Sequence, residues 1–435
     1  MVKMDNKAVI TGIGLVSALG LNPLETWTAL LSRKSGIRPI EEFDVRGFEC
    51  RAAAKVSGLD PVDLELHRRD SRIMDTHAFM LMKCSQDAFR QAALDQTSIP
   101  PEEIGFFAGI GMVDYNIEDL LPAVSKSIDA SGDLDYHAFY AHGFQEIYPL
   151  WPLSMLNNIS FCQVAINLGI EGENGVFSPH ADSCVQAIAE ATQTVLEQKA
   201  TAVLAGGVSE KVSPLSLARA SLSGNLNTEG KKQEVKCRPF DKNRQGTILG
   251  EGGGMVVLES QSNAEKRNVP CLAAIAGYGN VFGKSDGFNC PTREAMAGSM
   301  LKAIECAGLT PTDIDVVIAH GDSTKEGDKN ESEAIRQVFD EATHTVKVFA
   351  SKGAIGHLLS GAPAVDVILG IQMIQNGIIP AIGGDTAGND NLLGDLLCRW
   401  PIKRTPARIL INAHSYEGQA ASLIIESVKP KSQGA

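Results

Sequence analysis

Two stretches of the sequence decide the predicted fold. Residues 99–109 read IPPEEIGFFAG, and residues 309–319 read LTPTDIDVVIA. In both, a proline-containing turn and an acidic position lead into apolar residues typical of a buried strand. Each stretch also follows apolar residues at helical spacing, over 79–94 and over 296–307. The same pattern of helix, turn and strand therefore occurs once in each half of the chain.

A second pair of segments extends the similarity between the halves. A helical pattern over 185–196 precedes an apolar strand over 201–205, and another helical pattern over 362–375 leads to an apolar strand over 378–382. Together the two pairs predict an α/β protein made of two duplicated halves with buried central strands. A chance match between patterns this simple remains the alternative.

The composition fits this fold class and argues against several kinds of partner. The 435 residues include 42 glycines, which favour the tight turns of an α/β protein over a helical bundle. The net charge is −13 and no long basic tract offsets it, so we expect neither nucleic acid nor an anionic membrane as a partner. Polar residues such as Asp366 interrupt the apolar stretch 364–382, which argues against a membrane span.

The nine cysteines are scattered along the chain without any C-x-x-C pair. This distribution indicates reduced thiols and neither a disulfide framework nor a metal site. The basic start followed by apolar residues 8–20 is similar to a short export signal, but its three glycines favour strand, turn and helix. We therefore expect a cytoplasmic protein.

The glycine-rich segment 12–17, GIGLVS, follows a predicted strand over 7–11. It differs from a dinucleotide-binding fingerprint because Ser17 stands in place of the third glycine and no acidic strand end follows at the required distance. We interpret the segment as a structural turn between a strand and a helix. An oxidoreductase that binds a dinucleotide at this turn is the alternative from another functional class.

Five of the histidines have simple interpretations. His67, His77 and His344 lie among polar neighbours, so we expect them in contact with solvent. His137 and His142 are five residues apart, which does not place them on one helical face, so we do not expect them to bind a metal.

His320 and His357 are better candidates for chemistry. His320 ends the predicted buried strand 316–319, which is where α/β folds place reactive groups. His357 closes the glycine turn SKGAIGH at 351–357, five residues after Lys352. Neutral imidazoles on separate turns can stabilise a developing oxyanion or enolate, because they donate hydrogen bonds without adding net charge.

Three segments carry a resemblance to a known family. They are AHGDST at 319–324, SKGAIGHLL at 351–359 and RPFDKNRQG at 238–246. With the opening strand and Thr11-Gly12-Ile13-Gly14, they resemble the signature segments of β-ketoacyl-acyl-carrier-protein synthases along essentially the whole chain. The resemblance implies a thiolase-like fold of five α/β/α/β/α layers from two duplicated halves, which we place at 1–262 and 263–435. It also implies dimers whose sheets join.

The resemblance further implies a reaction and its residues. Members of the family load an acyl chain from the phosphopantetheine of an acyl carrier protein onto a cysteine at the N-terminus of a buried helix. Two histidines then assist decarboxylation of a malonyl thioester, and the enolate attacks the acyl-enzyme. By resemblance, His320 and His357 match the histidines, Lys352 the lysine, and Glu331 the acidic partner of that lysine. No bound cofactor or metal is implied, since the substrates arrive on the carrier protein.

The nucleophile is where the sequence departs from the family. The helix 185–196 and the strand ending at Ala205 align with the family pattern without a gap, and this places the cysteine at Ala181. The nearest thiol, Cys184, lies three residues later, which is about 300° around a helix. We interpret Cys184 as a small apolar residue packed in the helix.

Other departures lie in the surrounding segments. The family's glycine-rich loop, which gates the acyl pocket and supplies an oxyanion amide, here reads NAHSYEGQA at 412–420. His414 and Tyr416 therefore occupy the gate. Asp322 replaces a small hydroxyl residue beside His320 and adds a negative charge where an enolate would form.

These departures lead to an expected function. Chain-length factors of dissociated polyketide and polyene systems lack the cysteine and pair with an active synthase. We expect this chain to form such a heterodimer, to shape the acyl tunnel and to retain malonyl-carrier-protein decarboxylation, without condensing alone. The alternatives are an active β-ketoacyl-ACP synthase that uses Cys184 and a purely structural partner.

The resemblance also indicates where partners would bind. By analogy with the family, a dimer face is expected at 151–165 and along a strand at 175–178. Basic residues are the candidates for docking of the carrier protein, namely Arg68, Arg69, Arg72, Lys231 and Lys232.

Overall fold

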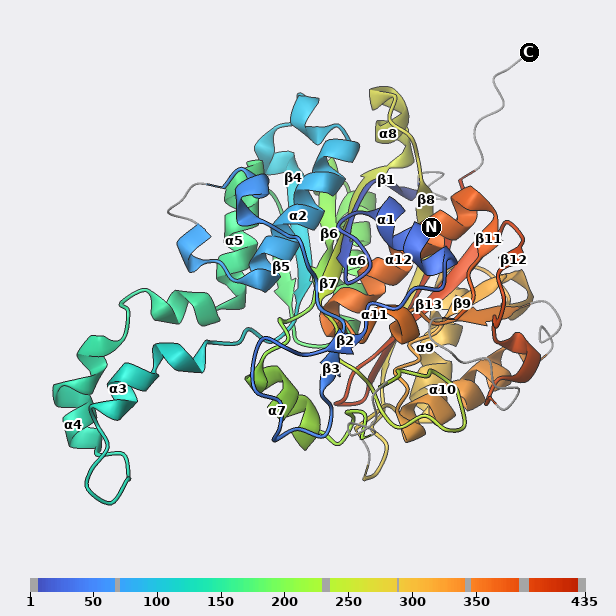
Figure 1. Cartoon of the computed structure of the whole chain (residues 1–435). Helices are drawn as coiled ribbons and strands as arrows, with labels where there is room; N and C mark the ends of the chain where they lie inside the picture. Colours follow the sequence, from blue (N-terminus) through green and yellow to red (C-terminus); the bar gives the residue numbers. More distant parts are fainter. Residues whose placement is uncertain are drawn as a thin grey trace, which may run out of the picture.

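Ten strands form one mixed sheet at the centre of the molecule (Figure 1). The computed structural model describes residues 7–66, 71–228, 235–287, 289–340, 346–382 and 391–428. Five strands come from the first half of the chain: β1 (Ala8–Ser17), β4 (Ile104–Ile110), β5 (Asn174–Phe177), β6 (Ala202–Val208) and β7 (Gly252–Ser260). Five come from the second half: β8 (Ala273–Phe282), β9 (Val316–Ile318), β10 (Lys347–Phe349), β13 (Arg408–His414) and β14 (Gln419–Glu426).

The strand order reveals the internal duplication. Across the sheet the order is β10-β9-β13-β14-β8-β1-β7-β6-β4-β5. Counted outward from the junction of β1 and β8, the strands of each half follow the same sequence order: first, fifth, fourth, second and third. Within each half, the three outer strands are parallel and the inner ones antiparallel. The predicted α/β fold from two duplicated halves is therefore confirmed. The exact boundary after residue 262 stays a prediction.

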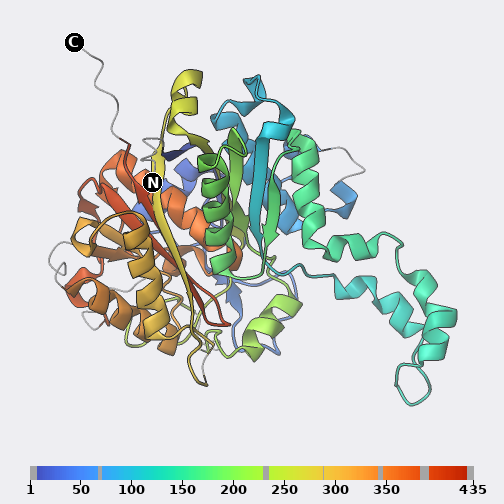
Figure 2. The same ribbon diagram turned by 180° about the vertical axis from the view of Figure 1, so that it is seen from behind.

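Helices complete the predicted five layers. Two helices, α6 (Ala181–Leu196) and α12 (Ala362–Asn376), lie between the two halves of the sheet and contact strands of both (Figures 1 and 2). The outer face of the first half is covered by α2 (Thr76–Gln91) with α5 (Asn157–Leu168), and that of the second by α9 (Arg293–Cys306) with α10 (Lys325–Val338). The central layer is buried on both sides, which explains why both of its helices are rich in apolar residues.

Shorter elements lie around these layers. They are α1 (Pro23–Leu31), α3 (Leu121–Ser125), α4 (Tyr136–Ala141), α7 (Pro214–Leu222), α8 (Gln261–Arg267), α11 (Lys352–Ile355) and the strand pairs β2 (Arg38–Pro39) with β3 (Ala52–Ala53) and β11 (Ile378–Ile379) with β12 (Ile402–Lys403).

The expected strand over 378–382 is wrong in length and place. Only β11 forms, and it pairs with β12 outside the central sheet. Pro380 follows directly and cannot donate a ladder hydrogen bond, so the strand ends there. The strand that follows α12 in the central sheet is β13.

The predicted turn at residues 12–17 is also wrong. β1 continues to Ser17, with one shift of register between Ile10 and Gly12, and α1 begins only at Pro23, capped by the Asn22 side chain. Gly12 and Gly14 are needed for close packing, because a Cβ at these positions would lie 2.1 Å from the Ala88 carbonyl oxygen and 2.0 Å from the Cys84 carbonyl oxygen of α2. Without a turn opening a helix, the basis for a dinucleotide site is lost.

His77 is buried in α2, contrary to the expected solvent contact, because the apolar face of this helix packs on β1. His67 and His344 lie outside the described residues. Burial lowers the pKa of His77 from 6.5 to about 4, although the neighbouring carboxylates of Asp75 and Asp114 oppose this shift.

This buried imidazole predicts a loss of stability in acid. Below pH 6.5 the unfolded chain takes up a proton at His77 that the folded chain does not, so the free energy of unfolding falls. Between pH 7 and pH 5 the loss should be about 2 kcal/mol relative to the His77→Gln variant. Urea unfolding of both proteins at the two pH values measures this difference. If the free energy of unfolding changed equally with pH in both proteins, His77 would not be the group responsible.

An arm of the chain, defined here as residues 116–150, extends from the body (Figure 1, α3 and α4). It exposes many large apolar side chains: Ile117, Leu121, Ile128, Leu134, Tyr136, Tyr140, Phe144, Tyr148 and Leu150. Apolar side chains concentrated in this way are typical of a surface that contacts another protein.

In the described part of the chain, every helix is too short or too polar to cross a bilayer.

Candidate functional site

Three histidines meet where strands of the second half end. His320 lies two residues after the end of β9, His414 ends the adjacent parallel strand β13, and His357 follows α11. The ring centre of His320 lies 5.0 Å from that of His357 and 4.9 Å from that of His414. All three side chains are buried. The structure therefore brings together His320, His357 and the predicted gate residue His414.

Hydrogen bonds define the protonation of the two central imidazoles. Nδ1 of His320 accepts from the backbone N–H of His414 at 3.2 Å, and Nδ1 of His357 accepts from the backbone N–H of Leu359 at 3.2 Å. Burial, followed by the charge of Lys352, holds the pKa of both histidines well below 6.5. Both rings are therefore neutral and carry their proton on Nε2. The site presents two neutral N–H donors.

Lys352 and Glu331 meet at the backbone of His320. The Lys352 ammonium donates to the His320 carbonyl oxygen, and the two carboxylate oxygens of Glu331 accept from the N–H groups of His320 and Gly321, each at 2.8 Å. Asn412 also donates to Glu331, at 3.0 Å. Burial raises the pKa of Glu331, although these donors and Lys352 oppose the shift. The lysine and the carboxylate together hold the end of β9 in place.

The hydrogen bonds of Glu331 predict that Glu331→Gln lowers the free energy of unfolding. One end of the amide would present a donor to a backbone N–H, so a buried donor loses its acceptor, at a cost of about 1–3 kcal/mol. Urea unfolding measures the change. Glu333→Gln, at an exposed position of the same helix α10, is the matched control and should leave stability within about 0.5 kcal/mol. Equal stability of both variants would contradict the role of Glu331.

Asp322 lies beside His320, as the sequence places it. One of its carboxylate oxygens is 4.0 Å from Nε2 of His320. The other accepts from the N–H of Thr324 at 2.9 Å and from its hydroxyl at 2.7 Å. The negative charge of Asp322 is thus held close to the Nε2–H donor of His320.

Ala181 is the first residue of α6 and is fully buried. The helix begins four residues earlier than the apolar pattern predicts, so Ala181 lies at the helix N-terminus. Cys184 is also fully buried, and its backbone packs so closely on Gly109 of β4 that a Cβ there would lie 2.7 Å from the Cys184 nitrogen. Burial raises the pKa of the Cys184 thiol. This thiol is protonated and enclosed in the core.

A pair of residues that the sequence interpretation missed lies beside Ala181. His180 precedes α6 without capping it, and its Nε2 lies 2.8 Å from a carboxylate oxygen of Glu417. The Tyr416 ring lies 5.0 Å from the His180 ring and 6.1 Å from the His357 ring. His180 and Glu417 are 237 residues apart in the sequence, so no local sequence pattern could have indicated their contact.

Three buried polar atoms in this region have no hydrogen-bond partner among the described residues. They are Nδ1 of His180, Nε2 of His414 and the hydroxyl of Tyr416. Buried polar atoms are nearly always paired in folded proteins, so unpaired ones close together indicate a site that accepts a polar ligand or water.

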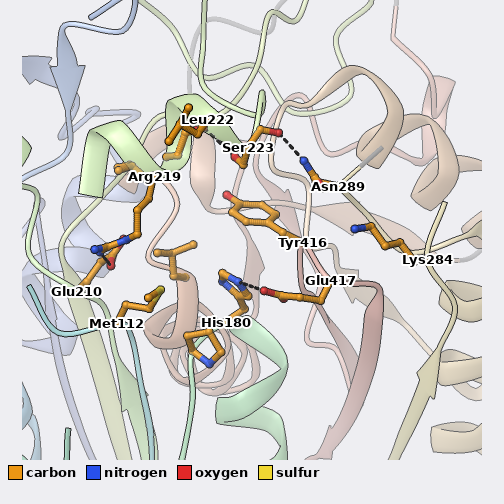
Figure 3. Close-up of a pocket in the computed structure, with 14 residues that line it drawn as sticks. Met112, His180, Glu210, Arg219, Leu222, Ser223, Lys284, Asn289, Tyr416 and Glu417 are labelled. Atoms are coloured by element: carbon orange, nitrogen blue, oxygen red, sulfur yellow. Dashed lines mark hydrogen bonds and ion pairs between the residues drawn. The ribbon is translucent and has the colours of Figure 1, made fainter. Parts of the chain in front are cut away.

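A cavity of about 430 Å³ is lined by two of these residues, His180 and Tyr416 (Figure 3). Tyr416, His180 and Glu417 border one side, and Arg219 with Glu210 border the other. Arg219 is paired with both Glu210 and Asp114. Burial raises the pKa of Glu210 to about 7, although Arg219 opposes the shift. The other lining residues are mixed in character. Six are apolar, namely Met112, Pro179, Ala220, Leu222, Leu249 and Leu359, and three are polar, namely Ser223, Lys284 and Asn289.

The candidate residues for carrier-protein docking are only partly placed. Arg68, Arg69, Lys231 and Lys232 lie outside the described residues. Arg72 belongs to a short 3₁₀ helix, Ser71–Ile73.

Comparisons with known proteins agree on one family. The family model "Beta-ketoacyl synthase, N-terminal domain" matches residues 5–264, and "Beta-ketoacyl synthase, C-terminal domain" matches residues 272–384. Among curated relatives, 3-oxoacyl-[acyl-carrier-protein] synthase 2 of Coxiella burnetii is 29% identical over 380 residues, which is 86% of this chain and 87% of the relative. The protein of the same description from Staphylococcus aureus strain COL is 29% identical over 374 residues, 86% of each chain.

Solved structures are similar over the full length. A β-ketoacyl synthase from Burkholderia phymatum STM815 has a TM-score of 0.84 at 25% identity and covers 98% of this chain and 100% of its own. The ishigamide ketosynthase/chain length factor has a TM-score of 0.82 at 24% identity, with the same coverage. These similarities agree with the thiolase-like fold built above.

Proposed function

Because the chain belongs to the β-ketoacyl synthase family, we propose that it is a chain-length-factor-like subunit. In this role it pairs with an active β-ketoacyl-ACP synthase and shapes the acyl tunnel without condensing substrates alone. The observation that carries the proposal is Ala181 at the N-terminus of α6. A methyl group cannot attack a thioester, so the covalent acyl-enzyme has no place to form.

The state of Cys184 supports the same conclusion. A reactive cysteine needs an accessible thiolate, whereas this thiol is fully buried and its pKa is raised. An active synthase that uses Cys184 is therefore the weaker alternative.

The retained groups fit the other half of the family's reaction. We propose that the two Nε2–H donors of His320 and His357 bind the thioester oxygen of malonyl-ACP. When carbon dioxide leaves, the electron pair moves onto this oxygen as an enolate, and two fixed donors stabilise it more than the ground state. Lys352 and Glu331 hold the His320 backbone. The carboxylate of Asp322 weakens this stabilisation, so we expect decarboxylation to be slow.

Two surfaces support a heterodimer. β5 is the last strand of the sheet on one side, and half of its residues are exposed, so its edge is available to a partner strand. The arm exposes its apolar side chains on the same half of the molecule. An acyl carrier protein is the second proposed partner, because the substrates of this family arrive on its phosphopantetheine.

A reconstitution experiment tests the proposal. The chain is produced with a cysteine-bearing synthase and acyl carrier protein, and the complex and its products are measured by light scattering and mass spectrometry. We expect a one-to-one heterodimer. Met112→Trp, which fills part of the cavity, should shorten the products, whereas Leu24→Trp at an exposed position should not. A homodimer that condenses octanoyl-ACP with malonyl-ACP alone would contradict the proposal, and unchanged product length would favour a purely structural partner.

A further inference from the structure

We propose that His180, positioned by Glu417, catalyses the hydrolysis of acyl thioesters at the N-terminus of α6. The substrate class rests on the proposed function, which brings acyl chains to this site on a carrier protein. The hydrolytic activity itself goes beyond that function. It would release a free carboxylic acid and return the carrier protein with its thiol.

The hydrogen bond to Glu417 leaves Nδ1 of His180 as the nitrogen that can accept a proton. A carboxylate can only accept hydrogen bonds, so the 2.8 Å contact with Glu417 requires the proton of His180 on Nε2. In the neutral imidazole Nδ1 then carries a free lone pair, and it is buried with no partner among the described residues. Although partial burial opposes ionisation, the hydrogen bond that His180 donates lowers the pKa of Glu417 below its usual value. An ionised carboxylate orienting an imidazole is the arrangement of hydrolases that activate a nucleophile.

The surroundings can position a thioester carbonyl next to this base. The first N–H groups of a helix have no acceptor within the helix, and that of Ala181 is the first of α6, whereas the N–H of Asp182 bonds to its own carboxylate. The Ala181 N–H can stabilise the oxyanion of a tetrahedral intermediate. His180, the residue before Ala181, lines the 430 Å³ cavity with Tyr416, and the apolar part of this lining suits an acyl chain. The base, one oxyanion donor and the acyl pocket thus lie next to one another.

The proposed step balances as a hydrolysis. Nδ1 of His180 takes a proton from water while the water oxygen bonds to the thioester carbon. The carbon–sulfur bond then breaks, and the imidazolium returns the proton to the departing phosphopantetheine thiolate. Because Ala181 carries no thiol, water is the nucleophile and no acyl-enzyme forms.

Octanoyl-loaded acyl carrier protein is the probe for the test. The full chain is incubated with it in ¹⁸O-labelled water, and mass spectrometry measures octanoate release. We expect turnover above the spontaneous rate, with one solvent oxygen in the product. His180→Ala and His180→Gln should each reduce kcat about 10²-fold or more. Glu417→Ala should reduce kcat about tenfold or more with KM unchanged, because Glu417 acts through His180.

Matched controls separate catalysis from folding. His137→Ala and Glu190→Gln change exposed residues of the same types, on the arm and on α6, and should keep the full rate. Release no faster than the spontaneous rate, or equal rates for His180→Ala and the unchanged protein, would overturn the proposal. The octanoyl thioester, unlike a malonyl thioester, has no free carboxyl group to lose as carbon dioxide, and the assay contains no second subunit. Failure here therefore leaves the chain-length proposal standing, and failure of heterodimer formation leaves this proposal standing.

Discussion

Malonyl-loaded acyl carrier protein is expected to lose carbon dioxide about 10²–10³ times more slowly on His357→Ala than on the unchanged protein. The reason is the pair of neutral donors at the site. The backbone N–H of Leu359 holds Nδ1 of His357, so its Nε2–H is directed by the fold and not by the substrate. Removing it takes away one of two donors to the enolate oxygen. Mass spectrometry of the carrier protein follows the conversion from malonyl to acetyl.

Two further variants sharpen this prediction. His357→Gln keeps an N–H donor in the side chain, so its rate should lie between those of the alanine variant and the unchanged protein. His137→Ala, which removes an exposed histidine of the arm, should have no effect. If His357→Ala decarboxylated as fast as the unchanged protein, the role of the two imidazoles would be wrong.

Ala181→Cys is expected to create a reactive thiol where none exists. A thiol at a helix N-terminus lies near unpaired N–H groups and the positive end of the helix dipole, which lower its pKa. At pH 7, iodoacetamide should modify position 181 faster than Cys184, because a larger fraction of the thiol at the helix N-terminus is thiolate. Peptide mapping by mass spectrometry measures both rates in one sample.

Cys184 provides the internal control for this variant. It is fully buried with a raised pKa, so it should stay unmodified in the folded protein and react only after unfolding in urea. Modification of Cys184 before position 181 would contradict the geometry of α6 described here.

Much of this architecture could be predicted because it depends on local patterns. The turn and strand at 99–109 recur at 309–319, and these segments became β4 and β9, matching strands of the two halves. His320 and His357 could be found because one ends a strand and the other closes a glycine turn. Ala181 could be placed because the segment from α6 to β6 aligns with the family pattern without a gap.

Other features depend on contacts between distant segments. In the sequence alone, the glycines of β1 predict a turn, and only the approach of α2 shows why no side chain fits there. The burial of His77 follows from the same contact between α2 and β1. The contact between His180 and Glu417 joins two segments that are distant in the sequence, the N-terminus of α6 and the loop between β13 and β14. Sequence spacing cannot reveal such a pair.

In the proposed function this chain forms no covalent acyl-enzyme. Intact-mass spectrometry, with peptide mapping, of the lone chain after incubation with octanoyl-ACP and malonyl-ACP tests this. We expect an unmodified chain and no 3-oxodecanoyl product. An octanoyl group attached to Cys184, together with 3-oxodecanoyl-ACP, would contradict the proposed function.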